Sequence, residues 1–286
     1  MTELKYVTEL ISTGDATEGQ LLIPRKILNT LIDEVGKALI PRSEAMMVLG
    51  PADIPGSSVD VDLTTENTGD VRLVPEGAEI PLDETEYTSF NVKPDKYGVS
   101  VRITREMMED SKWNLLQHQI KIFGKRFAEN ENSLILAQLD NAANTVSGGA
   151  AITIANITRA MQYLDDADYE GSTLLVGNEV LNDLRNIDTF VEANKVGNRE
   201  MLSTGFLGII YGLSVLKFST NAAPSSTYSK YAYVYDKSYA FIIAEKRSVS
   251  VEKFMLETYD MEGAALTQRL KVRYVRSNAI AKITTS

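Results

Sequence analysis

The chain has 286 residues, of which 44% are hydrophobic and 24% charged, proportions typical of a globular protein rather than a disordered one. It has no cysteine and one histidine, His118, which excludes disulfides and thiol nucleophiles and leaves too few ligands for a usual zinc site. The formal net charge of −10 disfavours a dedicated sequence-reading nucleic-acid binder but leaves room for weak contacts. No apolar run is long enough to cross a bilayer and no signal-peptide pattern is present, so we expect a soluble protein, made in a cytoplasm, without membrane contacts.

The first forty residues combine a polar segment with a helical pattern. Residues 1–20 show no sustained period and predict an extended arm that needs a partner surface to become ordered. Pro24 fits the first turn of a helix whose apolar spacing continues to Leu39, and this spacing is typical of ordinary core packing.

A long hairpin is expected next. Val59, Val61 and Leu63 alternate with Asp60 and Asp62, so one strand face is apolar and the other acidic. The two carboxylates could bind a hard cation, although such a face is more often simply solvated. Residues 71–74 are predicted to form the returning strand, so the segment 56–92 is expected to be a two-stranded arm. Such an arm is only marginally stable alone in water and needs another surface to stabilise it.

The middle of the chain predicts two strands and one long helix. Residues 87–93 and 97–103 alternate with a period of two, and Thr104 can cap a short helix that begins at Arg105. A second helix is expected at about 113–139 and would span about 40 Å. Its polar stretch 130–132 should face solvent or a charged neighbour. Its apolar stripe consists of Leu116, Ile120, Phe123, Phe127 and Leu134.

The remainder predicts a compact unit that mixes helices and strands. We expect a small-residue turn at 144–149, a short strand near Ile152, helices capped by Asn156 and Asn178, and a buried strand at 174–176 between them. Further strands are expected at 207–218, 231–235, 239–243, 249–256, 266–274 and 279–283. The polar face of 266–274 is basic, and either phosphate or the chain's own carboxylates could pair with it.

No constellation of residues nominates an active site. The glycines at 205–212 match neither phosphate-binding fingerprint, and adjacent acids such as Asp165 and Asp166 do not define an acid/base pair. His118 sits on the predicted long helix, where a surface or interface role is the simpler interpretation. We therefore expect no enzyme activity, no catalytic residues, no metal and no cofactor.

The order of these features resembles the major capsid proteins of tailed bacteriophages and related archaeal viruses. The resemblance spans essentially the whole chain and is most specific at Val74-Pro75-Glu76-Gly77-Ala78-Glu79-Ile80-Pro81 and at the helix entry 103–111. It implies the Hong Kong 97-type α+β fold, with an N-terminal arm at 1–23 and an extended loop at 55–93. The implied peripheral domain comprises 24–54, 94–149 and 245–286, with a spine helix at about 113–139, and the implied axial domain comprises 150–244.

The resemblance also implies that the chain assembles with itself into the pentamers and hexamers of an icosahedral shell around double-stranded DNA. It places the protein in the virion, after assembly in the host cytoplasm. Portal, scaffold and decoration proteins are further candidate partners, and packaged DNA would be contacted weakly and without sequence preference. The extended-loop residues expected to contact a neighbouring subunit are Val74, Pro75, Glu76, Ile80, Pro81, Phe90 and Val92.

Two departures from the family pattern and two alternatives accompany this interpretation. Residues 51–92 contain no lysine, so we expect a shell without the covalent cross-links that some members form. The chain begins almost directly at the arm, so we expect any scaffolding segment to be already removed, separate or unnecessary. The alternatives are an encapsulin-like protein compartment, which has the same fold, and a soluble enzyme that uses carboxylates.

Overall fold

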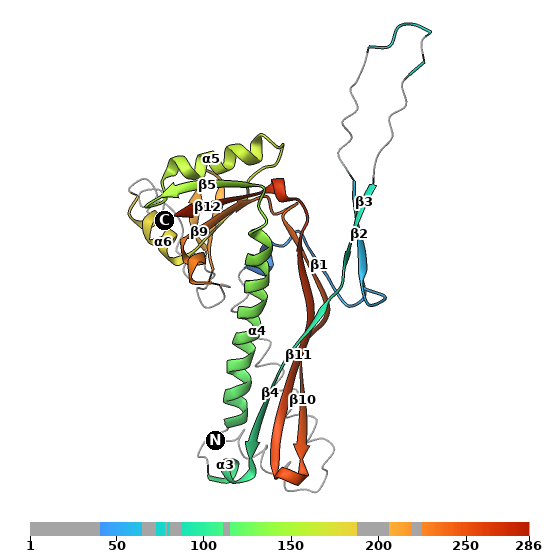
Figure 1. Cartoon of the computed structure of the whole chain (residues 1–286), viewed down its shortest axis with the longest axis vertical. Coiled ribbons are helices and arrows are strands. Elements are labelled where there is room, and N and C mark those ends of the chain that lie inside the picture. The colour runs from blue at the N-terminus through green and yellow to red at the C-terminus, as the bar shows by residue number, and fades with distance from the viewer. Residues whose placement is uncertain are drawn as a thin grey trace, which may run out of the picture.

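The computed structural model of the chain describes residues 41–64, 73–77, 79–80, 87–110, 115–187, 206–218 and 225–285. These residues form an elongated body with a sheet-and-helix unit at one end and a hairpin that projects from one side (Figure 1). The predicted arm and the helix at 24–39 lie outside the described residues. Among the described helices, none combines the length and apolar character needed to cross a bilayer.

A four-stranded sheet forms the long part of the body, in the order β1-β10-β11-β4. Its hairpin β10–β11 and the flanking strand β4 are antiparallel, whereas β1 pairs with β10 in parallel. Alternate residues of β11 are buried, which explains the period of two in its sequence. The strands are β1 (Met47–Leu49), β4 (Asp95–Thr104), β10 (Phe241–Leu256) and β11 (Met261–Tyr274), with η5 (Glu257–Tyr259) between the last two.

Helix α4 (Leu115–Leu139) runs along this sheet, as expected for the long helix (Figure 1). The short helix α3 (Arg105–Asp110) precedes it, and the predicted cap is confirmed because the Met107 N–H donates to Thr104 Oγ1 at 3.3 Å. Ile120 and Phe127 of α4 are buried against Leu266 of β11. The helix therefore covers one face of the sheet over much of its length.

A six-stranded sheet forms the second unit, in the order β5-β12-β9-β6-β8-β7. Helices α5 and α6 pack on one face, through apolar residues such as Leu164 and Leu184. The other face, which includes Tyr233 and Tyr235, meets the last turns of α4 and the near end of β10 and β11, so a single buried cluster joins the two sheets. The elements are β5 (Asn144–Gly149), α5 (Ile154–Asp165), β6 (Thr173–Val176), α6 (Asn178–Arg185), β7 (Phe206–Ile210), β8 (Leu213–Lys217), η4 (Ser226–Lys230), β9 (Tyr231–Tyr235), η6 (Ser277–Ala279) and β12 (Ile280–Thr285).

The third element is a hairpin of β2 (Val59–Thr64) and β3 (Tyr87–Val92), paired from Val59↔Val92 to Thr64↔Tyr87. The prediction of a returning strand at 71–74 is wrong for residues 73 and 74, which form no strand. Residues 71 and 72 lie outside the described residues. The partner of β2 is β3, and the described residues between them, 73–77, 79 and 80, lie beyond the paired part (Figure 1).

Several other local predictions are wrong. Residues 144–149 form strand β5 rather than a turn, because β12 supplies a parallel partner that the sequence alone does not reveal. The expected strand at Ile152 is replaced by the start of α5 after Thr153, and α6 starts after Gly177, with no side-chain cap hydrogen bond at either of these two N-cap residues. Pairing also places 144–149 and 280–285 in the six-stranded sheet and 241–244 in the four-stranded sheet. The division into peripheral and axial domains stays a prediction.

Candidate assembly surface

The tip of the projection, described at residues 73–77, 79 and 80, carries exposed apolar side chains. Leu73 is 97% exposed and Ile80 is 76% exposed, the highest values among the large apolar residues described. Pro75 and Glu76 are also exposed, Val74 is half-buried, and Gly77 adopts φ +82°, a left-handed turn conformation that favours glycine. The tip lies well beyond the β2–β3 pair and away from the body (Figure 1). Of the predicted interface residues, Pro81 lies outside the described residues.

The apolar residues at the base of the projection pack within their own chain, which differs from the prediction. Val92 is 1% exposed and packs with Leu49, Ile54 and Ile242 of the same chain, so its assignment as an intersubunit contact is wrong for this conformation. Phe90 packs against the same cluster and lies 5.0 Å from the Arg273 guanidinium, which covers its ring. Period-two alternation predicts an apolar face but does not say whether the partner is the same chain or another.

The predicted apolar stripe of α4 packs into the buried clusters of the subunit. Ile120 and Phe127 are buried, and Phe123 is half-buried in the same cluster against β4 and β11. Leu134 packs into the cluster that joins the two sheets. Leu116 lies on α4, and its side chain is outside the described ones.

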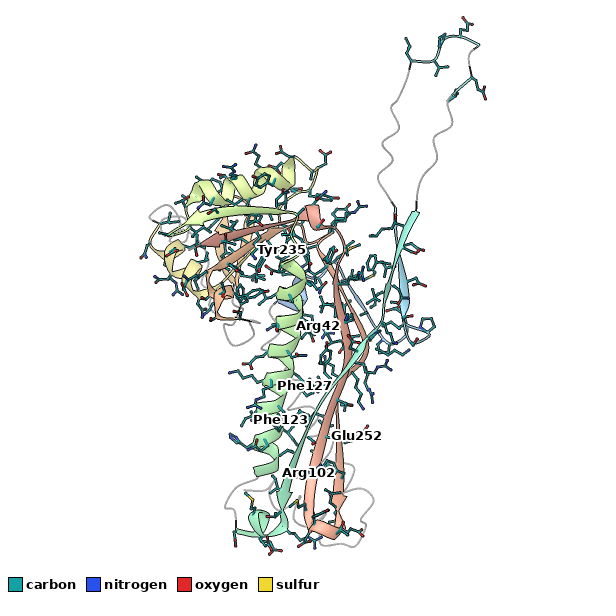
Figure 2. The ribbon with its side chains drawn as sticks, viewed as in Figure 1. Arg42, Arg102, Phe123, Phe127, Tyr235 and Glu252 are labelled. Carbon is teal, nitrogen blue, oxygen red and sulfur yellow. The ribbon has the colours of Figure 1, made fainter. Side chains whose placement is uncertain are left out.

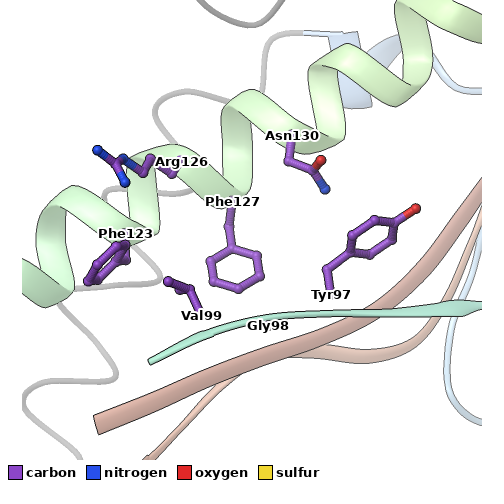
Figure 3. A pocket seen from close by; sticks show the side chains of 7 residues that line it. All are labelled: Tyr97, Gly98, Val99, Phe123, Arg126, Phe127 and Asn130. Atoms are coloured by element: carbon purple, nitrogen blue, oxygen red, sulfur yellow. The ribbon is translucent and has the colours of Figure 1, made fainter. Parts of the chain in front are cut away.

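A cleft of about 200 Å³ opens between α4 and β4. Phe123, Phe127 and Val99 form its apolar floor, with Tyr97 at one end (Figure 3). Arg126 lies at the rim, with its guanidinium carbon 5.6 Å from the centre of the Phe123 ring, and no ion pair involves it among the described residues. The Asn130 amide points from α4 toward β4, and its buried Nδ2 has no hydrogen-bond partner among the described residues (Figure 3).

A buried charge cluster fixes the middle of α4. Arg42 Nη1 donates to both carboxylate oxygens of Glu131 at 3.0 Å, and Arg42 also pairs with Glu245 of β10. Gln268 of β11 donates to Glu131 at 3.3 Å. Burial and the neighbouring Glu245 carboxylate raise the pKa of Glu131 despite the Arg42 charge. The predicted charged neighbour of 130–132 is thus Arg42, at the start of the described chain (Figure 2).

Two more polar contacts tie the sheets together. Glu44 of η1 (Pro41–Glu44) accepts a hydrogen bond from Thr173 of β6 at 2.8 Å. Asp140, just after α4, accepts from the Tyr233 hydroxyl at 3.3 Å and pairs with Lys282. Tyr228 also donates to Asp140, and burial together with that carboxylate raises the pKa of Tyr228 to about 12, so the phenol stays a donor. The sequence contained no local signal for these contacts, because each joins residues far apart in the chain.

The remaining predicted polar sites have ordinary partners. Lys271 of the basic strand face pairs with Asp95 at 2.7 Å, and Arg269 donates to the Pro94 carbonyl at 3.4 Å. Both cations therefore already have partners within the chain. Asp60 accepts a hydrogen bond from Asn91 at 2.6 Å. His118 is exposed on α4. No group of three or more metal-ligating side chains gathers within the described part of the chain.

Among the described residues, the subunit combines a joined pair of sheets with an exposed apolar tip that lies away from them. The family model for phage capsid proteins matches residues 86–279, and the chain belongs to this phage capsid protein family. It is therefore a structural protein of a capsid shell. None of the curated proteins matches this chain.

Solved structures share the fold at low sequence identity. The head structure of Helicobacter pylori bacteriophage KHP40 is 14% identical and covers 87% of this chain and 91% of its own, with a TM-score of 0.66. A structure of Microbacterium phage Oxtober96 is 15% identical and covers 85% and 90%, with a TM-score of 0.63. A virus-like particle from Pyrococcus furiosus is 12% identical and covers 91% and 98%, with a TM-score of 0.60. The predicted Hong Kong 97-type α+β fold is confirmed.

Proposed function

We propose that copies of this chain join as pentamers and hexamers into an icosahedral shell that encloses double-stranded DNA, after assembly in the host cytoplasm. The match to the phage capsid family carries this proposal, and the tip supports it, because its residues Leu73 and Ile80 are exposed among the described part of the chain. In this proposal the projection of 55–93 crosses onto a neighbouring subunit. Interfaces in such permanent assemblies bury large areas, which would cover Leu73 and Ile80.

The two sheets would take different places in the shell. We assign the four-stranded sheet with α4 to the peripheral domain and the six-stranded sheet with α5 and α6 to the axial domain, whose loops would meet around the five-fold and six-fold axes. Portal, scaffold and decoration proteins are proposed as further partners. Contact with packaged DNA would be weak, since the net charge is −10 and the basic residues Arg269 and Lys271 already have partners in the chain.

Family membership favours this shell over an encapsulin-like compartment or an enzyme. The matching family is defined by phage capsid proteins, and the match spans α4, both sheets and most of the strands that build them. Membership in a structural family supports a protein without enzyme activity.

The test removes the tip and keeps the base of the hairpin. Residues 65–86 are replaced by Asn-Gly, a two-residue turn that suits a hairpin whose last pair is Thr64↔Tyr87. We expect the wild-type chain to form hollow particles in negative-stain micrographs and the shortened chain to stay as subunits with an unchanged melting temperature. Normal shells from the shortened chain would show that the projection is not an intersubunit arm, and a wild-type chain that forms no particles would overturn the shell itself.

A further inference from the structure

We propose that the face of the four-stranded sheet opposite α4 carries a binding site for a phosphate group, formed by Lys96 of β4, Arg247 of β10 and Arg269 of β11. The strand register places these residues side by side, since Arg269 pairs directly with Arg247 on one strand and with Lys96 on the other. Directly opposed residues in neighbouring antiparallel strands have their side chains on the same face, about 5 Å apart. Three cations therefore form one row across the sheet.

The row points away from α4. On β11, Gln268 contacts α4 and Leu270 belongs to the cluster that joins the two sheets, so Arg269 between them points to the opposite face. On β4, Tyr97 lines the cleft beside α4, and its neighbour Lys96 is exposed on the other face. The long helix therefore does not cover the row.

No carboxylate neutralises the row within the described part of the chain. Neither Lys96 nor Arg247 has an ion pair or a hydrogen bond to a described residue. Arg269 donates to the Pro94 carbonyl at 3.4 Å, and this acceptor is neutral, so it leaves the guanidinium charge in place. A guanidinium has five N–H donors, and most of those of Arg269 stay available to a ligand.

The carboxylates on the same strands are engaged or lie further away. Asp95 pairs with Lys271 at 2.7 Å, and Glu245 pairs with Arg42 on the face that α4 covers. Glu252 lies further along β10, toward η5. The row is thus a concentrated positive patch on a chain whose net charge is −10.

The backbone of β10 is irregular on both sides of Arg247. Its register with β11 shifts between Glu245 and Arg247 and again between Arg247 and Ser250. Such bulges re-aim side chains and are frequent beside functional sites. Like charges in direct opposition destabilise a sheet, and an anion shared by the three cations removes that cost.

A phosphate group fits this row better than a protein segment does. Arginine and lysine hold phosphate oxygens through charge-assisted hydrogen bonds, and a guanidinium can offer two parallel donors. Beside the row, the same face carries the small residues Gly98, Ser100 and Thr267, and none of these is an aromatic anchor of the kind that protein interfaces favour. Two sources share the phosphate chemistry, namely free inorganic phosphate and the backbone of the double-stranded DNA in the proposed shell.

Calorimetric titration of inorganic phosphate into the whole chain, in a chloride buffer of constant ionic strength, tests the site. We expect saturable binding that is weakened at least about tenfold in K96Q/R247Q, because charge-assisted hydrogen bonds are lost. The matched control K121Q/R126Q removes the same charge from exposed positions of α4 and should keep the wild-type affinity within about twofold.

Thermal unfolding separates phosphate binding from a purely structural role of the row. In chloride, K96Q/R247Q should melt no lower than the wild type, because the opposed charges are reduced to one. In phosphate, the wild type should gain more in melting temperature than K96Q/R247Q, because only the wild type binds the ion at this site. The general stabilising effect of phosphate on folded proteins raises the melting temperature of both chains alike.

A short DNA duplex distinguishes the two sources. A duplex that displaces phosphate, with a salt slope of binding that falls by about two in K96Q/R247Q, identifies the DNA backbone as the ligand. A duplex that does not displace bound phosphate identifies the free ion. Wild type without saturable phosphate binding, or equal affinity in K96Q/R247Q, overturns this inference. Neither result bears on the shell, since the titration does not require assembly.

Discussion

At the scale of single residues, Arg42 and Glu131 show how a charged group is held inside this subunit. Glu131 is 1% exposed and shares the Arg42 cation with Glu245, so one positive charge serves two carboxylates. Burial favours the neutral acid, and the second carboxylate favours it further, which explains why the pKa of Glu131 is raised although Arg42 is 3.0 Å away. The folded state therefore binds a proton at Glu131 more tightly than the unfolded chain does.

This linkage predicts a pH dependence of stability. Because the pKa of Glu131 is raised above its ordinary value of 4.5 in the folded state, the wild-type chain loses stability relative to Glu131→Gln as pH rises from below 4.5 through the raised pKa. The glutamine keeps an acceptor for Arg42 but carries no charge, so E131Q lacks this loss. Urea unfolding of both chains at several pH values measures it.

The control for that experiment is Glu129→Gln, on the same helix, where the carboxylate is more exposed and pairs with Lys125 at 4.0 Å. Its free energy of unfolding should follow the wild type across the same pH range within a few tenths of a kcal/mol. A stability difference between E131Q and wild type that does not change with pH would contradict the assigned cause.

At the scale of elements, the regular periods were predictable and the long-range pairings were not. The stripe of α4, the alternation in β4 and β11 and the Thr104 cap all depend on neighbours within a few residues, so the sequence carries their signal directly. Strand β5 consists of small and polar residues and becomes a strand only because β12 pairs with it from more than 130 positions away. Likewise, nothing near Arg42 in sequence indicates its two acidic partners.

In the candidate site too, the long-range contacts could not be predicted from the sequence. Residues 74–81 were expected at an interface because their sequence resembles the extended loop of the capsid family, whereas the pattern of the residues alone had predicted a strand at 71–74. Phe90 and Val92 were assigned to a neighbouring copy because their apolar face lacked an evident partner, and Ile54 and Ile242 supplied that partner within the chain. The cleft was missed because it is formed by α4 and β4 together.

The α4 stripe makes a direct prediction about stability. Phe127→Ala removes a side chain that is 6% exposed, and we expect the free energy of unfolding to fall by about 3–5 kcal/mol through lost burial and a cavity. Lys125→Ala, two residues away and 65% exposed, should change it by less than about 0.5 kcal/mol. Denaturant unfolding compares the two, and a similar small change in both would show that α4 does not depend on this face.

At the scale of the whole molecule, two sheets behave as one body while the projection stands apart from it. A shared cluster that includes Leu136, Tyr235 and Phe241 joins the sheets, and the contacts of Glu44 and Asp140 reinforce that joint (Figure 2). No comparable cluster supports the tip among the described residues. In the proposed shell, the tip would therefore depend on neighbouring subunits for its contacts.

The same shell should be held without covalent bonds. No lysine lies between residues 51 and 92, so beyond Lys93 at its base the projection has no side-chain amine for an isopeptide bond, and no cysteine is available for a disulfide. Purified shells boiled in detergent, with or without reductant, should give one band near 31.6 kDa. A ladder of multiples of that mass would contradict this prediction.

The tip lies away from the body of the subunit, so the two surfaces can be lost separately (Figure 1). In the proposed shell, a copy with a shortened tip still presents the body that a neighbour's projection would cross. Such a copy would join a growing shell and leave the next subunit without its contact, so a small minority of shortened copies would block assembly. An unfolded copy would present neither surface and would not interfere.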